Sequence, residues 1–182
     1  PSDYFEKIFS KFSESSGLGI ASGSCFLVER GKRIVEVVAV DHTRGGLKTY
    51  RKECFDDIGG IREVDGWDGI DNAIAQMKGW ETRNFLEIEA HHQRRTGTYS
   101  GLVRGCFESG KFAHAMRYYL PFIVARSIHR MLRKPFLIGG ISMILGYWYG
   151  ALVGQPAVME PHESLFLRNK QKVRMSIWRK QE

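Results

Sequence analysis

Cysteine is scarce in this chain, and the cysteines that occur are scattered. The 182 residues include only Cys25, Cys54 and Cys106, with no CxxC pair and no other spacing typical of a metal site. This argues against a cysteine-based zinc site, and an odd set without a disulfide framework is typical of a reducing compartment. We expect Cys25 and Cys54 to serve as small apolar residues.

Other patterns are missing as well. There is no internal repeat, no low-complexity segment and no GxxxxGK[ST] phosphate-binding loop, which excludes repeat architectures and P-loop nucleotide binding. Hydrophobic residues make up 43% and charged residues 26%, which indicates a chain that builds a core and is not disordered. The length fits one domain, or one domain with an appendage.

Positive charge is in excess. A net charge of +7 and a pI of about 9.4 suit nucleic acid, anionic lipid or phosphate-bearing ligands. Much of the Lys and Arg lies from Lys111 onward, around a long apolar run, and this location favours lipid. The aromatic residues are not interleaved with Lys and Arg as a base-stacking surface needs, so we expect no nucleic-acid partner.

The N-terminal part predicts alternating helices and strands. A helix begins at Asp3, where Glu6 completes a capping signal. Its apolar stripe consists of Tyr4, Phe5, Ile8, Phe9 and Phe12.

Two short apolar runs within 18–31 are separated by Ser22-Gly23-Ser24, and the second run is predicted to pair with 33–40 through a turn at 30–32. The next elements are a polar loop at 41–46, a strand and short helix ending at Gly59, and a strand over 82–92.

An acidic cluster stands at the start of another predicted helix, within 59–80. Asp65, Asp68 and Asp71 follow the tight turn that Gly59 and Gly60 allow. The apolar residues that recur at helical spacing are Ile70, Ala73, Ile74 and Met77, and Gly79 ends the helix. In one interpretation the cluster is catalytic. In the other, Asp68 is the helix N-cap and Asp71 is its partner in a variant capping box.

The C-terminal part has a different character. A helix is predicted over 112–134 despite Pro121, with Arg126, His129, Arg130 and Arg133 on one face, a pattern typical of helices that lie at a membrane surface. The segment 135–159 then has no charge and is long enough to span a bilayer. Its small residues recur every four positions, at Ser142, Gly146, Gly150 and Gly154, which suits close helix contact in lipid.

Both flanks of this apolar segment are basic. A single crossing would put one flank on the wrong side of the membrane, so we favour a re-entrant or surface-lying hairpin over a true span. The remaining alternative is a buried, glycine-rich helical pair in a globular domain.

Four stretches taken in order carry a family resemblance: SGSCFLV, RGGLKTYRKECFDDIGGI, GWDGIDNAIAQMKGW and HHQRRTG. From Pro1 to about Gly97 the chain resembles the C-terminal half of an inverting family 2 glycosyltransferase with the GT-A fold. PSDYFEKI is similar to the segment that follows the metal-binding DxD motif in that family. This chain contains no DxD, and it begins with Pro, so we expect a fragment of a longer protein.

The resemblance assigns candidate site residues. The family's acidic motif, often ED, corresponds to the stretch that begins at Trp67. This implies Asp68 as the base that deprotonates the acceptor, with Asp71 as the runner-up, and Trp67 as a residue that binds acceptor or donor. His91 or His92 would meet the metal or the diphosphate, and strand alternation lets only one of them serve. Arg94 and Arg95 would neutralise the diphosphate. Arg44, Gly45 and Gly46 match a stretch that lines the acceptor cleft. The QxxRW motif of processive synthases is absent, since Gln93 is followed by Arg94, Arg95, Thr96 and Gly97.

The expectation is therefore an α/β fold, the mixed α+β half of a GT-A domain over 1–97, followed by an all-helical membrane-associated tail over 98–182. The resemblance implies transfer of a hexosyl-type sugar, with inversion, from a nucleotide-sugar donor to a lipid-linked or polysaccharide acceptor in cell-envelope or exopolysaccharide synthesis. It implies Mg²⁺ or Mn²⁺, bound mainly by the DxD half, membrane lipids as partners, and the cytoplasmic face of a bacterial inner membrane as the location. The fragment alone would be inactive. The alternative is a non-catalytic basic module that binds membranes or other proteins.

Overall fold

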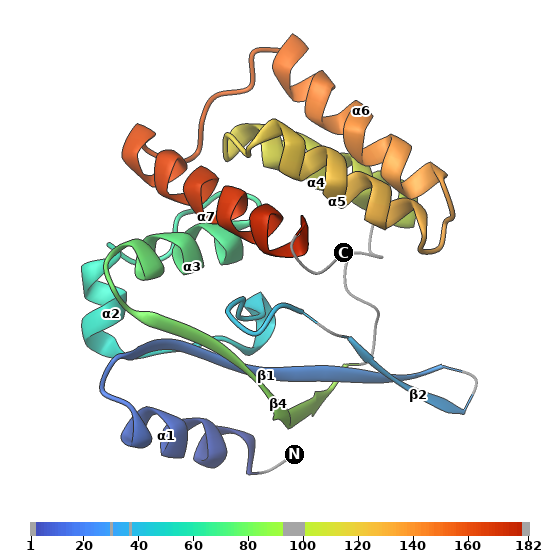
Figure 1. Cartoon of the computed structure of the whole chain (residues 1–182). Coiled ribbons are helices and arrows are strands. Elements are labelled where there is room, and N and C mark those ends of the chain that lie inside the picture. Colours follow the sequence, from blue (N-terminus) through green and yellow to red (C-terminus); the bar gives the residue numbers. More distant parts are fainter. Residues whose placement is uncertain (1–2, 30, 37, 93–100, 180–182) are drawn as a thin grey trace. The chain divides into compact units, whose positions relative to one another are not determined.

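The structure is a computed structural model that describes residues 3–29, 31–36, 38–92 and 101–179. The chain forms two compact units, 1–95 and 96–182. The first is a mixed α/β unit, and the described part of the second is helical (Figure 1). The predicted order of an α/β part followed by a helical part is confirmed at this level.

One long strand organises the first unit. Strand β1 (Leu18–Glu29) pairs antiparallel with β2 (Lys32–Glu36) and β3 (Thr49–Tyr50), and parallel with β4 (Glu81–His91). The sheet is therefore mixed. The hairpin of β1 and β2 confirms the pairing predicted through the turn at 30–32, although β2 is shorter than expected.

The predicted break at Ser22-Gly23-Ser24 is wrong, because β1 continues through it. What the sequence pattern marks is a shift in the register of β1 against β4, between Gly23 and Ser24. A Cβ atom at position 23 would lie 2.2 Å from the carbonyl oxygen of Ile88. Only glycine fits so close a backbone approach.

Helices cover the two faces of the sheet (Figure 1). Helix α1 (Tyr4–Glu14) packs Tyr4 and Ile8 against Phe85 and Ile88 on one face. Helices α2 (Lys52–Asp57) and α3 (Trp67–Met77) lie on the other side of the sheet. Both occur at the places in the chain where the sequence predicts helices.

The predicted apolar stripe of α1 is only partly correct. Tyr4 and Ile8 are buried and Phe12 packs against the same cluster, but Phe5 and Phe9 are 62% and 57% exposed. Their rings stack on each other with centroids 6.2 Å apart. A five-residue stripe is wider than the strip of helix surface that this sheet covers.

The second unit consists of α4 (Leu102–Ala115), α5 (Leu120–Met131), α6 (Ile138–Leu152) and α7 (Pro161–Arg179). The single helix predicted over 112–134 is wrong, since the chain breaks between α4 and α5. Pro121 explains the break, because proline lacks an N–H and fits only in the first turn of a helix. It stands in the first turn of α5.

The small-residue ridge makes the close helix contact that its spacing predicts. Gly146 lies against α4, where an added Cβ would come 2.0 Å from the carbonyl oxygen of Phe107. From the opposite side, a Cβ at Gly110 would come 1.8 Å from the carbonyl oxygen of Met143. Ser142 donates a hydrogen bond of 2.9 Å to the carbonyl oxygen of Val103. Gly154 lies beyond the end of α6 and does not take part.

The apolar segment 135–159 supplies α6, which is 15 residues long. In the described part of the chain, no helix combines the length and the apolar character needed to cross a membrane.

Candidate functional site

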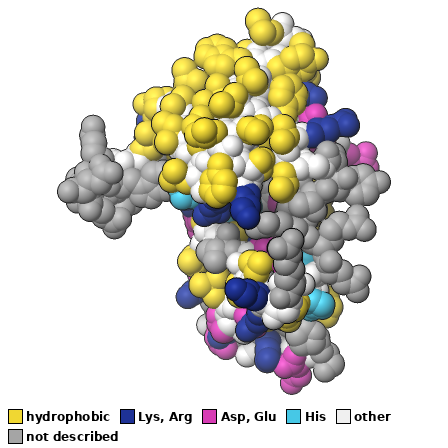
Figure 2. Space-filling model, turned by 90° about the vertical axis from the view of Figure 1, so that its right-hand side faces the viewer, with side chains coloured by type: hydrophobic (Ala, Val, Ile, Leu, Met, Phe, Trp, Pro, Cys, Tyr) yellow, Lys and Arg dark blue, Asp and Glu magenta, His cyan; other side chains and the backbone are white. Residues whose placement is uncertain are grey.

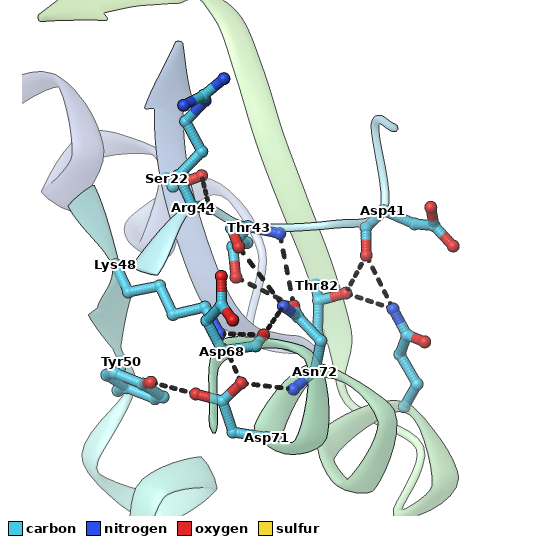
Figure 3. Close-up of polar contacts among 11 residues, drawn as sticks. Ser22, Asp41, Thr43, Arg44, Lys48, Tyr50, Asp68, Asp71, Asn72 and Thr82 are labelled. Carbon is cyan, nitrogen blue, oxygen red and sulfur yellow. Dashed lines mark hydrogen bonds and ion pairs between the residues drawn. The ribbon is translucent and has the colours of Figure 1, made fainter. Parts of the chain in front are cut away.

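The polar loop at 41–46 runs between the sheet and α3, and polar side chains hold it from both sides (Figure 3). The Thr82 hydroxyl, from β4, donates to the carbonyl oxygen of Asp41 at 2.7 Å. The Thr43 hydroxyl donates to Oδ1 of Asn72, on α3, at 2.9 Å. The loop conformation is therefore set by contacts with two different elements.

A third anchor comes from β1. The backbone N–H of Arg44 donates to Oγ of Ser22 at 3.0 Å, and Ser22 in turn donates to Oδ1 of Asn84 at 2.9 Å. Ser22, Thr43, Asn72 and Asn84 are all at most 4% exposed. Polar groups this deeply buried are kept only when they are hydrogen-bonded, and here each one is.

The loop then passes directly over the start of α3. A Cβ added to Gly45 would lie 3.3 Å from Cβ and 3.5 Å from Oδ2 of Asp68, and 3.4 Å from the ring of Trp67. The backbone at Gly45 therefore lies against the first turn of α3, beside the Asp68 carboxylate. The fold thus brings three predicted site residues together: Gly45, Trp67 and Asp68.

Asp71 has a different environment from Asp68. It is 3% exposed, and its carboxylate accepts from the Lys48 ammonium group and from the Tyr50 hydroxyl (Figure 3). Lys48 also donates to the carbonyl oxygen of Asp68 at 2.6 Å and lies over the Trp67 ring, 5.2 Å from its centroid.

Burial raises the pKa of Asp71 and lowers the pKa of Lys48, and in each case the partner's charge opposes the shift. The pKa of Tyr50 is raised by burial and then by its hydrogen bond to the Asp71 carboxylate. Asp71 is therefore a buried partner of Lys48 and Tyr50.

The capping interpretation of the acidic cluster is wrong. The N-cap of α3 is Gly66, with φ +75°, and no side chain caps the helix. Asp68 lies inside the first turn, where a negative charge is favourable next to the free N–H groups.

The carboxylate of Asp68 is accessible. The residue is partly exposed, and within the described residues no donor bonds to its side-chain oxygens. Of the two predicted acids, Asp68 has the exposure and the open coordination that a general base requires.

The predicted metal residues His91 and His92 point to different surroundings. The ring of His91 is exposed and stacks on Phe26, with centroids 5.2 Å apart. His92 lies near Cys25 and Glu36, and the potential ligand atoms of these three residues are all within 4.8 Å of one another. This is the one such cluster among the described residues.

Arg44 brings a positive charge to this cluster. Its guanidinium group donates to Oε2 of Glu36 at 2.8 Å, while Nδ1 of His92 is 3.6 Å from the same oxygen. Burial raises the pKa of the Cys25 thiol, and the charge of Arg44 opposes that shift. With the arginine charge already beside the carboxylate, these residues do not fit a divalent cation.

The remaining predicted site residues are Arg94, Arg95 and Gly46. Arg94 and Arg95 lie outside the described residues. Gly46 is exposed in the short helix Gly45–Leu47, with no atom within 4 Å of an added Cβ.

Sequence reasoning missed several residues that build the site, among them Ser22, Lys48, Asn72, Thr82 and Asn84. Two signals could have found some of them. Ser22 is a polar residue inside an apolar strand, and Lys48 is two positions from Tyr50, so both side chains lie on the same side of an extended segment.

Comparisons with models of known protein families, with curated proteins and with solved structures find no match to this chain. The resemblance to family 2 glycosyltransferases therefore rests on the chain's own residues.

Proposed function

We propose that this chain is the acceptor-side half of an inverting family 2 glycosyltransferase of the GT-A fold. It would transfer a hexosyl-type sugar from a nucleotide donor to a lipid-linked or polysaccharide acceptor at the cytoplasmic face of a bacterial inner membrane. In this proposal Asp68 is the general base, and the loop at Arg44, Gly45 and Gly46 lines the acceptor cleft.

One observation carries the proposal: the close approach of Gly45 to the accessible carboxylate of Asp68. The residues come from segments more than 20 positions apart, and buried hydrogen bonds hold the loop in place. A base is effective only where its position relative to the acceptor hydroxyl is fixed, since proton transfer requires hydrogen-bond distance. In the proposal, the anchored backbone of the loop forms one side of the acceptor cleft and so fixes the acceptor hydroxyl relative to Asp68.

The chemistry asked of Asp68 is limited. Its carboxylate accepts the proton of the acceptor hydroxyl while that oxygen bonds to C1 of the donor sugar. The bond between C1 and the diphosphate oxygen breaks, and its electron pair leaves with the diphosphate. Attack from the side opposite the leaving group inverts the configuration at C1.

The leaving diphosphate needs positive charge. In the proposal Arg94 and Arg95 provide part of it from this chain. Mg²⁺ or Mn²⁺ would provide the rest, held mainly by the DxD half, since the Arg44 guanidinium group already pairs with Glu36 beside His92. This half alone is expected to be inactive.

The test compares substitutions of two aspartates that are three positions apart. Turnover is measured for the full-length protein in membranes, with UDP- and GDP-sugars as donors and with Mn²⁺. Asp68→Asn is expected to lower kcat by about 10²–10⁴-fold, the usual contribution of a general base. Asp65→Asn removes an exposed carboxylate at the same turn and should leave kcat near wild type. Circular dichroism melting controls for folding.

Near-normal turnover of folded Asp68→Asn would refute the role of Asp68. Absence of turnover by the wild type with every donor would favour the alternative, a non-catalytic basic module.

A further inference from the structure

Helix α6 shows an entirely apolar stripe on its outward face. The exposed residues that share this face are Ile138, Ile141, Leu145, Trp148, Tyr149 and Leu152, which are between 46% and 85% exposed. The opposite face, with Gly146 and Gly150, packs against α4. A helix at the surface of a soluble domain normally carries polar residues on its outer side, so another apolar medium or molecule is expected to cover this one.

The connection between α5 and α6 extends the apolar surface. Leu132, Phe136 and Leu137 are 71%, 58% and 63% exposed. Leu137 also has a positive φ of 58°, a conformation that is unfavourable for a residue with a side chain. Figure 2 shows hydrophobic side chains gathered in one broad area of the helical unit.

Basic residues interrupt the apolar side chains at this connection. Arg133 and Lys134 stand between Leu132 and Phe136 and are exposed. The Arg130 guanidinium group donates to the carbonyl oxygens of both, each at 2.9 Å, and so holds the connection in its conformation. The segment 101–176 contains eleven Lys and Arg but only three acidic residues.

We propose that the outer face of α6 and the connection at 132–138 form a docking surface for an anionic lipid bilayer. The helix lies in the plane of one leaflet, its apolar stripe enters the acyl boundary, and Arg133 and Lys134 contact lipid phosphates. This surface is independent of the proposed glycosyl transfer, and it would bring a lipid-linked acceptor close to the chain.

The charge pattern favours a lipid bilayer over a second protein as the partner of this surface. A second protein would cover the apolar stripe equally well, but it would need an acidic surface to match the eleven Lys and Arg that stand against three acidic residues in 101–176. A membrane surface instead accepts apolar and basic side chains side by side, because the chains enter the lipid while the charges stay with the headgroups. The finding that no described helix is able to cross a membrane is compatible with a helix that lies flat.

The experiment measures binding of the 182-residue chain to vesicles of phosphatidylcholine alone and with phosphatidylglycerol, by flotation at low and high salt. Tight binding is expected only with the anionic lipid, and it should weaken with salt. Leu145→Glu should reduce binding by about tenfold to a hundredfold, from the lost burial of one leucine. The double change Arg133→Ser and Lys134→Ser should reduce it by about 25-fold, at about fivefold per charge.

Leu165→Glu is the matched control, because Leu165 is as exposed as Leu145 but lies on α7. It should bind like the wild type, and circular dichroism verifies the fold of each variant. Equal binding to neutral and anionic vesicles, or equal losses for Leu145→Glu and Leu165→Glu, would overturn the proposal. A dimer that Leu145→Glu disrupts, in a chain that does not bind vesicles, would also overturn it and would assign the surface to a second copy.

Discussion

Replacing Asp71 with asparagine is expected to destabilise the first unit strongly. The side chains of Asp71 and Lys48 are 4% and 1% exposed, so each charge depends on the other. Asparagine has nearly the same shape and still offers an acceptor to the Tyr50 hydroxyl, but it leaves the Lys48 ammonium group buried without its counter-charge. Breaking a buried ion pair by removing one partner costs about 3–5 kcal/mol.

The loss of stability has an upper limit, because Lys48 can release its proton instead of remaining buried as an unpaired charge. Releasing it at pH 7 costs about 4.6 kcal/mol, which is about 1.36 kcal/mol for each of the roughly 3.4 units below the ordinary lysine pKa. Burial already lowers the pKa of Lys48 in the folded protein. In the variant the unfolded state binds more protons than the folded state, so stability should rise with pH, by at most about 1.4 kcal/mol per unit between pH 7 and 9.

The assay is urea unfolding followed by circular dichroism at pH 7, 8 and 9. Asp68→Asn is the matched control, because Asp68 is partly exposed and its side chain accepts no bond from the described residues. It should change the free energy of unfolding by less than about 0.5 kcal/mol. A loss below about 1 kcal/mol for Asp71→Asn, or equal losses for the two variants, would show that Asp71 and Lys48 do not form a buried pair.

Three further predictions concern other parts of the fold. Gly146→Ala should destabilise the helical unit by more than about 2 kcal/mol in thermal melts, because the added methyl group meets the Phe107 carbonyl, whereas Gly46→Ala, with open space around it, should not. Tyr4→Phe should cost about 1–3 kcal/mol in urea unfolding, since the hydroxyl donates to Leu47 and accepts from the N–H of Gly23. Burial, reinforced by Asp57, raises the pKa of Cys54 to about 11. A raised thiol pKa means that the folded state holds its proton longer, so stability should fall by up to about 2–3 kcal/mol as the pH rises from 9 to 11, and Cys54→Ala should remove that part of the loss.

The elements of the first unit follow from local sequence signals. The apolar run at 25–28 and the β-branched residues Ile34 and Val35 predict the hairpin, and Gly59 and Gly79 mark the ends of α2 and α3. These signals depend on neighbouring residues along the chain, so a single sequence contains them. The spacing of Ser142, Gly146 and Gly150 likewise predicts a close helix contact, although it does not identify α4 as the partner.

The error over 112–134 was avoidable, because Pro121 is a local signal for a helix start that the apolar periodicity outweighed. The other errors arose where tertiary packing decides the outcome. Phe5 and Phe9 have the spacing of buried residues, but the sheet is too narrow to cover them. The choice between Asp68 and Asp71 depends on where Lys48 lies, and Lys48 is 23 positions from Asp71 in the sequence.

The buried polar residues behind the loop at 41–46 support the proposal that the loop has a function. Ser22, Thr43, Asn72 and Asn84 occupy positions between sheet and helix where apolar residues would pack without needing partners. Their hydrogen bonds contribute little net stability, because the same groups bond to water in the unfolded chain. What they do determine is the path of the backbone from Asp41 to Gly45, and therefore the distance between that backbone and the Asp68 carboxylate. Proteins tend to depart from the usual pattern of an apolar interior at functional sites. Here the buried polar residues support the loop that lies beside the Asp68 carboxylate, to which we assign the chemistry.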